Sequence, residues 1–241
     1  MYKKIMLVND DGIHAEGLEK LAEAAARFGK VWVVAPNSQC SAMSMRLSVF
    51  DKITVTPYGF PATVEGAWVL DGTPVDCVKI ALKVLLPEKP DVVICGINNG
   101  FNTGFDIAYS GTVGAAMEAR MQGIPAIAFS NAYNGSFETA EAYLPLLIED
   151  LIFARPEENE IWNVNFPGVS LDECAGIQTD CSIAPMQLYR DLFQREELDG
   201  ESFRLHNRGE FAKMEEAPEG SDIHGVLNGY VTVGRIPCQV L

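Results

Sequence analysis

The chain has 241 residues, of which 48% are apolar, and its 18 basic and 33 acidic residues give a formal net charge of −15. A chain of this size can bury the core of one large α/β domain, and its acidity argues against a broad basic surface for nucleic-acid polymers or anionic membranes. A small anionic substrate remains compatible if a metal ion supplies local positive charge.

Membrane attachment and metal-binding cysteine motifs are not expected. No segment approaches the roughly 20 consecutive apolar residues of a membrane span, and the first residues do not form a signal peptide. We therefore expect a cytoplasmic protein. The six cysteines lack Cys-x-x-Cys spacing, which excludes a zinc ribbon and a thioredoxin-like motif. We expect them to be reduced thiols that mostly pack in the core: Cys40, Cys77, Cys95, Cys174, Cys181 and Cys238.

The first two thirds of the chain alternate between strand-like and helix-like segments with short connections. This pattern is typical of a Rossmann-like α/β fold, in which helices cover both faces of a mostly parallel sheet. In chain order we predict a strand at 4–8, a helix at 16–28, a strand at 31–35, an extended arm or edge strand at 47–58, a helix at 73–86, a strand at 91–95, a helix at 111–122, a strand at 124–129, a helix at 137–153 and a strand at 161–164.

The character of the chain changes after about residue 168, where it becomes irregular and charged. We therefore predict a core at 1–167 and a smaller C-terminal region at 168–241 with β-hairpin-like extensions and a short strand at 230–233. We expect this region to serve in oligomerisation and to cover the active site, and we leave open whether it returns to the core.

The tetrapeptide Asn9-Asp10-Asp11-Gly12 follows the apolar strand at 4–8 directly. Two adjacent carboxylates at the end of a buried strand repel each other and lose solvation, so a fold retains them only where something cationic compensates. An isolated Asp-Gly would be interpreted as an ordinary turn. The strand before it and the second aspartate instead favour a bound metal ion.

Two further polar loops follow predicted strands, and the carboxyl ends of parallel strands are where ligands bind in such sheets. One loop offers the hydroxyls of Ser38, Ser41 and Ser44, and the other the amides of Asn98, Asn99 and Asn102. Oxygen ligands without histidine suit Mg²⁺, Mn²⁺ or Ca²⁺ better than zinc or copper. A connection rich in Asx turns is an equally good interpretation of the asparagine loop by itself.

The sequence Ser110-Gly111-Thr112 opens the predicted helix at 111–122, and small residues there leave backbone N–H groups free to receive an anion. We predict a phosphate-binding helix start, which is compatible with a hydroxyl that also caps the helix. The three histidines are widely separated, and we expect surface or structural roles for them rather than metal ligation: His14, His206 and His224.

At this point the chain resembles the survival protein E (SurE) family, metal-dependent 5'/3'-nucleotidases. The matching stretches occur in the expected order over nearly the whole sequence: VNDDGI at 8–13, VVAPNSQCSA at 33–42, DGTPVDCVK at 71–79, CGINNGFNTGFDIAYSGTVGAAMEA at 95–119 and GYVTV at 229–233. The resemblance implies a Rossmann-like core, one divalent metal ion and hydrolysis of nucleoside 5'- and also 3'-monophosphates to nucleoside and phosphate.

The resemblance also implies roles for single residues. The metal ligands would be Asp10, Asp11, Ser41 and Asn98, and the phosphate would contact Asn98, Ser110, Gly111 and Thr112, with Asn102 shaping the loop. Asp10, Asp11 and Asn98 are then the candidate catalytic residues. Mg²⁺ or Mn²⁺ is the expected ion, and Ca²⁺ is a further ion that the site could accept.

The expected partners are nucleoside monophosphates, short polyphosphate as a further substrate, and other copies of the chain in a homodimer or homotetramer. Two alternatives share an acidic strand end: a receiver-like phosphate-binding signalling module, and a haloacid-dehalogenase-like phosphatase with a covalent aspartyl intermediate. The receiver register puts Gly96 near the position of the phosphoacceptor aspartate. The phosphatase requires Asp-x-Asp, which Asp10-Asp11-Gly12 does not supply.

Overall fold

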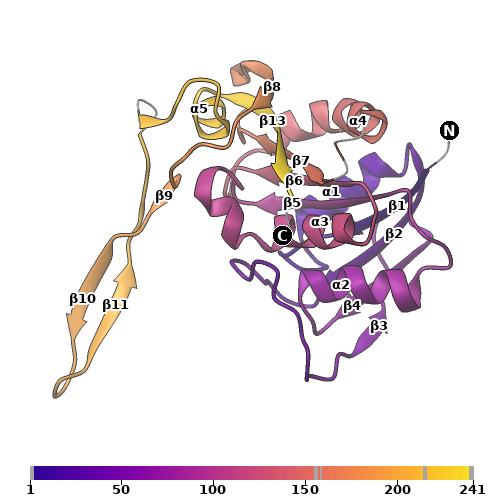
Figure 1. Cartoon of the computed structure of the whole chain (residues 1–241), viewed down its shortest axis with the longest axis horizontal. Coiled ribbons are helices and arrows are strands. Elements are labelled where there is room, and N and C mark those ends of the chain that lie inside the picture. Colours follow the sequence, from indigo (N-terminus) through magenta and orange to yellow (C-terminus); the bar gives the residue numbers. More distant parts are fainter. Residues whose placement is uncertain (1–2, 155–156, 158, 214–215, 239–241) are drawn as a thin grey trace.

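A nine-stranded sheet forms the centre of the computed structural model, which describes residues 3–154, 157, 159–213 and 216–238. Its strand order is β3-β4-β2-β1-β5-β6-β7-β13-β8, and the strands from β4 to β7 run parallel (Figure 1). These central strands are β4 (Gly66–Leu70), β2 (Gly29–Pro36), β1 (Lys3–Val8), β5 (Val92–Asn99), β6 (Ala126–Asn131) and β7 (Glu160–Phe166). The predicted α/β class with a mostly parallel sheet is confirmed.

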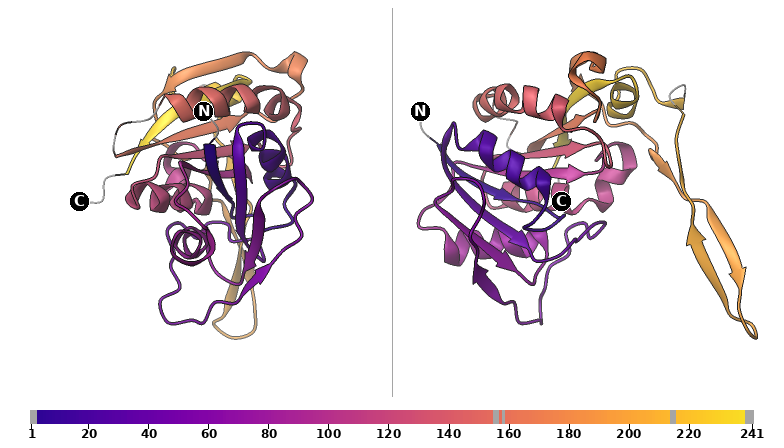
Figure 2. Two further views of the ribbon diagram at one scale, coloured as in Figure 1. Left: turned by 90° about the vertical axis from the view of Figure 1, so that its right-hand side faces the viewer. Right: turned by 180° about the vertical axis from the view of Figure 1, so that it is seen from behind.

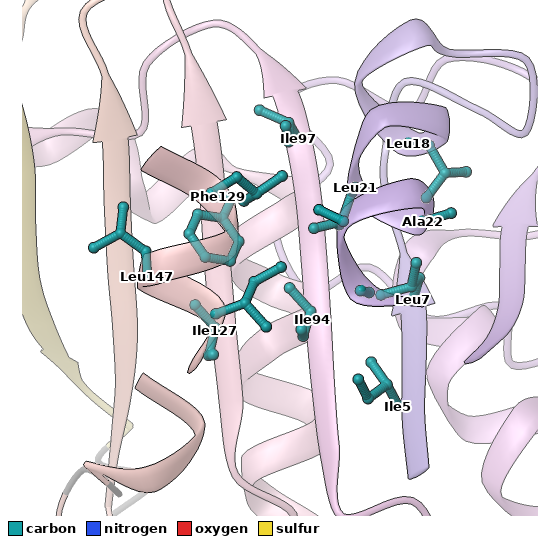
Figure 3. Close-up of a cluster of buried hydrophobic side chains, with 14 of the residues drawn as sticks. Ile5, Leu7, Leu18, Leu21, Ala22, Ile94, Ile97, Ile127, Phe129 and Leu147 are labelled. Carbon is teal, nitrogen blue, oxygen red and sulfur yellow. The ribbon is translucent and has the colours of Figure 1, made fainter. Parts of the chain in front are cut away.

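Helices cover both faces of the sheet because successive side chains of each central strand point to opposite faces. Ile5 and Leu7 of β1 join one buried cluster with helices α1 (Glu16–Ala25) and α4 (Glu138–Phe153) (Figure 3). Met6 and Val8 join a second cluster with α2 (Pro74–Ile80) and α3 (Gly111–Met121). Because these central strands are buried on both faces, their sequences are nearly continuous runs of apolar residues.

Several predicted boundaries were wrong, and one strand was missed. The helix predicted at 16–28 ends at Ala25, and Gly29 opens β2 as the partner of Lys3. A Cβ at Gly29 would lie 1.8 Å from the Lys3 carbonyl oxygen, so close strand approach explains this glycine better than a helix stop. Of the arm at 47–58 only β3 (Val55–Pro57) is a strand, antiparallel to the missed strand β4.

The end of α2 and the end of β5 also differ from expectation. The helix predicted at 73–86 is α2 followed by a π-helical turn, Ala81–Leu85. Strand β5 continues past an irregularity between Cys95 and Asn98, so Asn98 stands in a strand rather than in the predicted loop. The pairing of β5 with β6 therefore holds the candidate ligand.

After residue 168 the chain adds two strands to the central sheet and also forms a hairpin outside it. Strand β13 (Tyr230–Pro237) pairs antiparallel with β7, and β8 (Gly176–Cys181) closes that edge. Between them, β10 (Phe193–Glu197) and β11 (Phe203–Asn207) form a hairpin that extends away from the sheet, as the right-hand view of Figure 2 shows. The predicted hairpin-like extension is confirmed, and the division at residue 168 stays a prediction.

The remaining elements connect the hairpin to the sheet. Strands β9 (Tyr189–Arg190) and β12 (Glu210–Phe211) pair at the base of the hairpin, and helix α5 (Asp222–Leu227) precedes β13. Short 3₁₀ turns lie at Gly104–Tyr109 and Leu171–Glu173. All six cysteines are free thiols, as expected, and no helix in the described part of the chain is long and apolar enough to cross a membrane.

The close packing of α1 against β5 gives a direct test of the fold. A Cβ at Gly17 would lie 2.2 Å from the backbone oxygen of Ile97, whereas none of the described atoms comes within 4 Å of a Cβ at Gly59. Gly17→Ala should therefore lower the free energy of unfolding by about 1–3 kcal/mol through overpacking. Gly59→Ala is the matched control, and equal stability of the two variants in urea denaturation would contradict this packing.

Candidate active site

The candidate residues meet where the order of the sheet reverses. Strand β1 has β2 on one side and β5 on the other, and the chain leaves β1 towards β2 before returning to β5. Such a topological switch point leaves a crevice outside the carboxyl ends of the strands, which is where open α/β sheets bind ligands. Three segments reach this crevice: the turn after β1, the loop after β2, and the end of β5 with the start of α3.

The turn after β1 is held by its own hydrogen bonds. Asn9 is fully buried, and its Nδ2 donates to the Gly12 carbonyl at 2.9 Å. Gly12 has a φ of +100°, which side chains other than glycine rarely adopt. The Cys40 amide donates to the Asp10 carbonyl at 2.6 Å and so ties the loop after β2 to this turn. The rigid turn fixes the direction of both carboxylates.

Asp10 lies deep in the crevice against the start of α3. Only 2% of the residue is exposed, and Thr112 Oγ1 donates to its Oδ1 at 2.5 Å. A Cβ at Gly111 would lie 2.9 Å from Asp10 Oδ2, so the small residue at the helix start makes room for the carboxylate. The pKa of Asp10 is raised to about 6, mainly by burial and to a smaller extent by the charge of Asp11. The hydrogen bond from Thr112 opposes this increase.

Asp11 is half-buried and faces the other side of the turn. Its Oδ2 accepts a hydrogen bond from the backbone N–H of Asn99 at 2.8 Å. Burial raises the pKa of Asp11, and hydrogen bonds from Asn99 and Gln39 oppose that change. Within the described part of the chain, no lysine or arginine forms an ion pair with Asp10 or Asp11. The pair is therefore electrostatically uncompensated by the protein.

Ser41 and Asn98 belong to two of the three segments that reach the crevice, the loop after β2 and the end of β5. Ser41 follows Cys40 directly and is exposed in the loop after β2. Asn98 is half-buried, and its Nδ2 donates to the Gly100 carbonyl at 2.8 Å. This bond fixes the amide so that its Oδ1 is the atom left for a ligand.

The α3 start has the features of an anion site, and both of its hydroxyl groups make hydrogen bonds within the protein. Ser110 is the N-cap, and its Oγ accepts from the Val113 amide at 3.0 Å. Thr112 is fully buried with its hydroxyl on Asp10. The N–H of Gly111, the first helical residue, lies outside the ladder of the helix. The Gly111 N–H and the proton of the Ser110 hydroxyl therefore remain as candidate donors at this end of α3.

Sequence reasoning named Asn102 as shaping the loop between β5 and α3 but missed the two asparagines of β7 that hold it. Asn102 is buried. Its backbone N–H donates to Asn165 Oδ1 at 2.8 Å, and its side-chain Nδ2 donates to Ser130 Oγ at 2.8 Å. Asn163 and Asn165 of β7 both donate to the Asn102 carbonyl. Asparagines inside an apolar strand were the available signal, although their partner lies about sixty residues away in the chain.

The histidines lie outside the cluster formed by the aspartates and α3. His14 Nδ1 lies 3.0 Å from the Tyr58 hydroxyl, His206 lies beside Glu196 on the hairpin, and His224 belongs to α5. In the described residues no group of three or more His, Cys, Asp or Glu side chains is arranged to hold a metal. A metal here must therefore use the two aspartates with neutral oxygens, and this hard donor set fits a Mg²⁺-like ion.

Comparison with known proteins decides the family. Residues 5–187 match the family model described as Survival protein SurE. The chain belongs to the SurE family. It is 38% identical to the 5'-nucleotidase SurE of Mannheimia succiniciproducens over 98% of this chain and 92% of that protein. It is 36% identical to the 5'-nucleotidase SurE of Histophilus somni over 96% of this chain and 91% of that protein.

The fold agrees with a solved structure of the family. The SurE protein from Aquifex aeolicus superposes with a TM-score of 0.84 at 33% identity, covering 98% of this chain and 94% of that one. The resemblance seen in the sequence motifs is therefore confirmed. Membership of the SurE family also sets aside the receiver-like and haloacid-dehalogenase-like alternatives.

The raised pKa of Asp10 makes a testable contribution to stability. Folded Asp10 keeps its proton up to about pH 6, whereas the unfolded chain loses it near 3.8, so this group's contribution falls as pH rises between these values. The difference between the folded and unfolded pKa values of Asp10 lowers the free energy of unfolding by about 3 kcal/mol above pH 6. Asp10→Asn should remove this cost in metal-free protein.

Urea denaturation in EDTA between pH 4 and 8 measures the effect. Asp10→Asn should gain stability over the unaltered protein as pH rises to 6 and keep that gain above it. Asp150→Asn, an exposed change on α4, is the control and should run parallel to the unaltered protein. A constant difference between Asp10→Asn and the unaltered protein at all pH values would contradict the assignment.

Proposed function

We propose that this member of the SurE family hydrolyses nucleoside 5'-monophosphates, and also 3'-monophosphates, to nucleoside and phosphate with one divalent ion, Mg²⁺ or Mn²⁺. That the chain is a 5'-nucleotidase, as its sequence predicted, follows from its family and its identity to enzymes of that name. The observation that carries the metal dependence is the uncompensated pair Asp10 and Asp11 facing the start of α3.

The donor set supports metal binding at this pair. Asp10, Asp11, Ser41 and Asn98 would hold the ion, because they supply carboxylate, hydroxyl and amide oxygens at one edge of the sheet. The desolvation that raises the pKa of Asp10 would be offset by a cation, so the ion and the buried carboxylate stabilise each other. When bound, the ion would polarise a phosphoryl oxygen and acidify a water.

The protein's own groups would act on both sides of the phosphate. The N–H of Gly111 at the positive end of α3 would receive an equatorial phosphoryl oxygen. Thr112 and the Asn9–Gly12 turn would hold Asp10 in one orientation, and Asn102 with β7 would keep the loop around Asn98 in place. Because these groups are fixed before substrate arrives, they stabilise developing charge without reorganisation.

Removal of one ligand tests the site. Asp11→Asn should lower Mn²⁺-dependent release of phosphate from 5'-AMP by more than about 100-fold. Even the mutation of a residue that only hydrogen-bonds a metal ligand lowers metal affinity or activity by about 10- to 100-fold. A phosphate assay with and without EDTA measures it. Asp150→Asn is the matched control, and near-normal turnover by Asp11→Asn would refute the ligand assignment.

We propose that the protein acts in the cytoplasm, on nucleoside monophosphates and short polyphosphate, as a homodimer or homotetramer. The hairpin supports assembly, because one of its faces carries Phe193, Phe203 and Leu205, which are 59%, 46% and 51% exposed, beside the charged side chains of Arg195 and Glu197. The opposite face carries the polar side chains of Gln194, Glu196, Arg204 and His206. A lone hairpin is marginally stable in water, so a second copy would cover the apolar face.

Light scattering after gel filtration tests the assembly. Phe193→Ser with Leu205→Ser should reduce the mass of the particle towards that of one chain, because both changes remove apolar contact area. Gln194→Ser with Arg204→Ser alters only the polar face and should leave the mass unchanged. An unchanged mass in the first variant would show that this face does not join the copies.

A further inference from the structure

The 3₁₀ turn Gly104–Tyr109 leads the chain from β5 into the start of α3. Its end adjoins Ser110, the N-cap of α3, whose N–H donates to the Ile107 carbonyl at 3.2 Å. The Tyr109 carbonyl accepts a hydrogen bond of 2.9 Å from the N–H of Ser44, in the loop after β2. Where this turn lies therefore affects both the α3 start and the loop after β2.

The turn has few internal interactions to fix its position. The hydrogen bonds of a 3₁₀ turn have poorer geometry than those of an α-helix, and such turns rarely extend beyond a few residues. Only Gly104 and Ile107 of this turn are buried, while Phe105, Ala108 and Tyr109 are exposed. A turn of this kind keeps one position only where other parts of the fold hold it.

Asp222, the first residue of α5, holds the beginning of the turn. It is 5% exposed, and its Oδ2 accepts a hydrogen bond from the Gly104 N–H at 2.9 Å. Its Oδ1 accepts from the N–H groups of Ala184 and Ile223 at 2.9 and 2.8 Å. In the part of the chain that the structure describes, no lysine or arginine forms an ion pair with this carboxylate. Backbone N–H groups from three segments are thus its partners.

These hydrogen bonds resist displacement of the turn. Burial raises the pKa of Asp222, and the N–H groups of Ala184, Gly104 and Ile223 oppose that change. Hydrogen bonds to an ionised acceptor are about twice as strong as neutral ones. A buried group that loses its partner bears its full desolvation cost. Movement of the turn away from Asp222 would leave both the Gly104 N–H and a carboxylate oxygen without this bond.

Close packing fixes the same point of contact. Gly104 has a φ of +53°, and a Cβ there would lie 2.2 Å from the Met186 carbonyl oxygen and 2.7 Å from Ile223 Cδ1. The next residue, Phe105, donates its N–H to the same Met186 carbonyl at 2.9 Å. The beginning of the turn is therefore in direct contact with the segment before the hairpin and with α5.

A second aspartate ties the turn to the base of the hairpin. Asp106 Oδ2 accepts hydrogen bonds from the N–H groups of Leu188 and Tyr189 at 3.1 and 3.2 Å, and Tyr189 begins β9. The C-terminal region supplies none of the candidate metal ligands or phosphate contacts. It nevertheless holds the turn that leads into α3 at two places.

We propose that Asp222 is a positioning residue for the hydrolysis: it holds the 3₁₀ turn so that the Gly111 N–H meets the phosphoryl group in one fixed place. The proposal rests on the proposed function, since it concerns the phosphate side of the same site. Asp222 acts through Gly104 and the turn rather than on the substrate. Because a donor fixed in advance stabilises the charge that develops in the transition state, loss of this hold lowers kcat more than it raises KM.

Removing one acceptor oxygen tests the role of Asp222. Asp222→Asn keeps the shape of the side chain but replaces a carboxylate oxygen with an amide donor, so at least one backbone N–H loses its partner. The kcat for 5'-AMP with Mn²⁺ should fall about 10- to 100-fold, because a displacement of about 1 Å can cost 10²-fold. The KM should change by less than about threefold. An unchanged kcat would overturn the proposal.

Two controls separate positioning from a general loss of structure. Asp172→Asn makes the same chemical change at an exposed position and should leave kcat and KM unchanged. Val226→Ala removes buried packing from α5 but keeps the Asp222 carboxylate. It should lower the midpoint of urea denaturation, while kcat of the folded protein stays within about twofold of the unaltered value. A loss of kcat in Val226→Ala as large as in Asp222→Asn would overturn the positioning role.

Hydrogen exchange measured by mass spectrometry separates this proposal from the proposed function, since it requires no turnover. In Asp222→Asn the amides of residues 104–110 should exchange at least about tenfold faster than in the unaltered protein, and in Val226→Ala at an unchanged rate. Faster exchange, together with no phosphate release by the unaltered protein, would overturn the proposed hydrolysis but support the hold on the turn. Unchanged exchange in Asp222→Asn would overturn that hold, whether or not the protein hydrolyses 5'-AMP.

Discussion

Two neighbouring carboxylates at the end of a buried strand are the constraint on which the rest of the structure depends. Asp10 and Asp11 repel each other and lose hydration, yet no lysine or arginine within the described residues pairs with them. The fold lowers this cost in part through Thr112 and through the positive end of α3. The proposed small, hard cation would offset what remains, because carboxylate oxygens are its preferred ligands.

The order of the strands decides which polar segments lie next to this pair of carboxylates. Because β1 lies between β2 and β5, the loops that leave these three strands meet at one crevice. The irregularity between Cys95 and Asn98 lets β5 continue, so that Asn98 is held by strand pairing. Asparagines of β7 then hold the loop that leads to α3. The site is therefore rigid mainly through backbone pairing and buried amide bonds.

Asp11 divides the crevice into two environments with different chemistry. On the side of Asp10 and α3, backbone dipoles and the proposed metal ion favour a phosphoryl group. On the other side lies a cavity lined by neutral amides, Phe137 and several carboxylates.

The sequence by itself determined the fold class and which strands end in polar residues. Runs of apolar residues on both faces of the strands specify a buried parallel sheet, and the residues that follow each strand are local in sequence. Boundaries were less well predicted: Gly29 belongs to β2, and β4 was missed, because close backbone approach and strand pairing are decided by distant partners.

Only the tertiary structure showed which donors are already engaged and what surrounds them. Thr112 was expected to contact phosphate, which stays a prediction, and the structure shows in addition that its hydroxyl donates to Asp10, while Asn163 and Asn165 were not expected at all. The cavity beside Asp11 is formed by α1, β5 and α4, which are far apart in the chain. No local pattern encodes a cavity, because its shape and charge arise from segments that meet only after the sheet has formed.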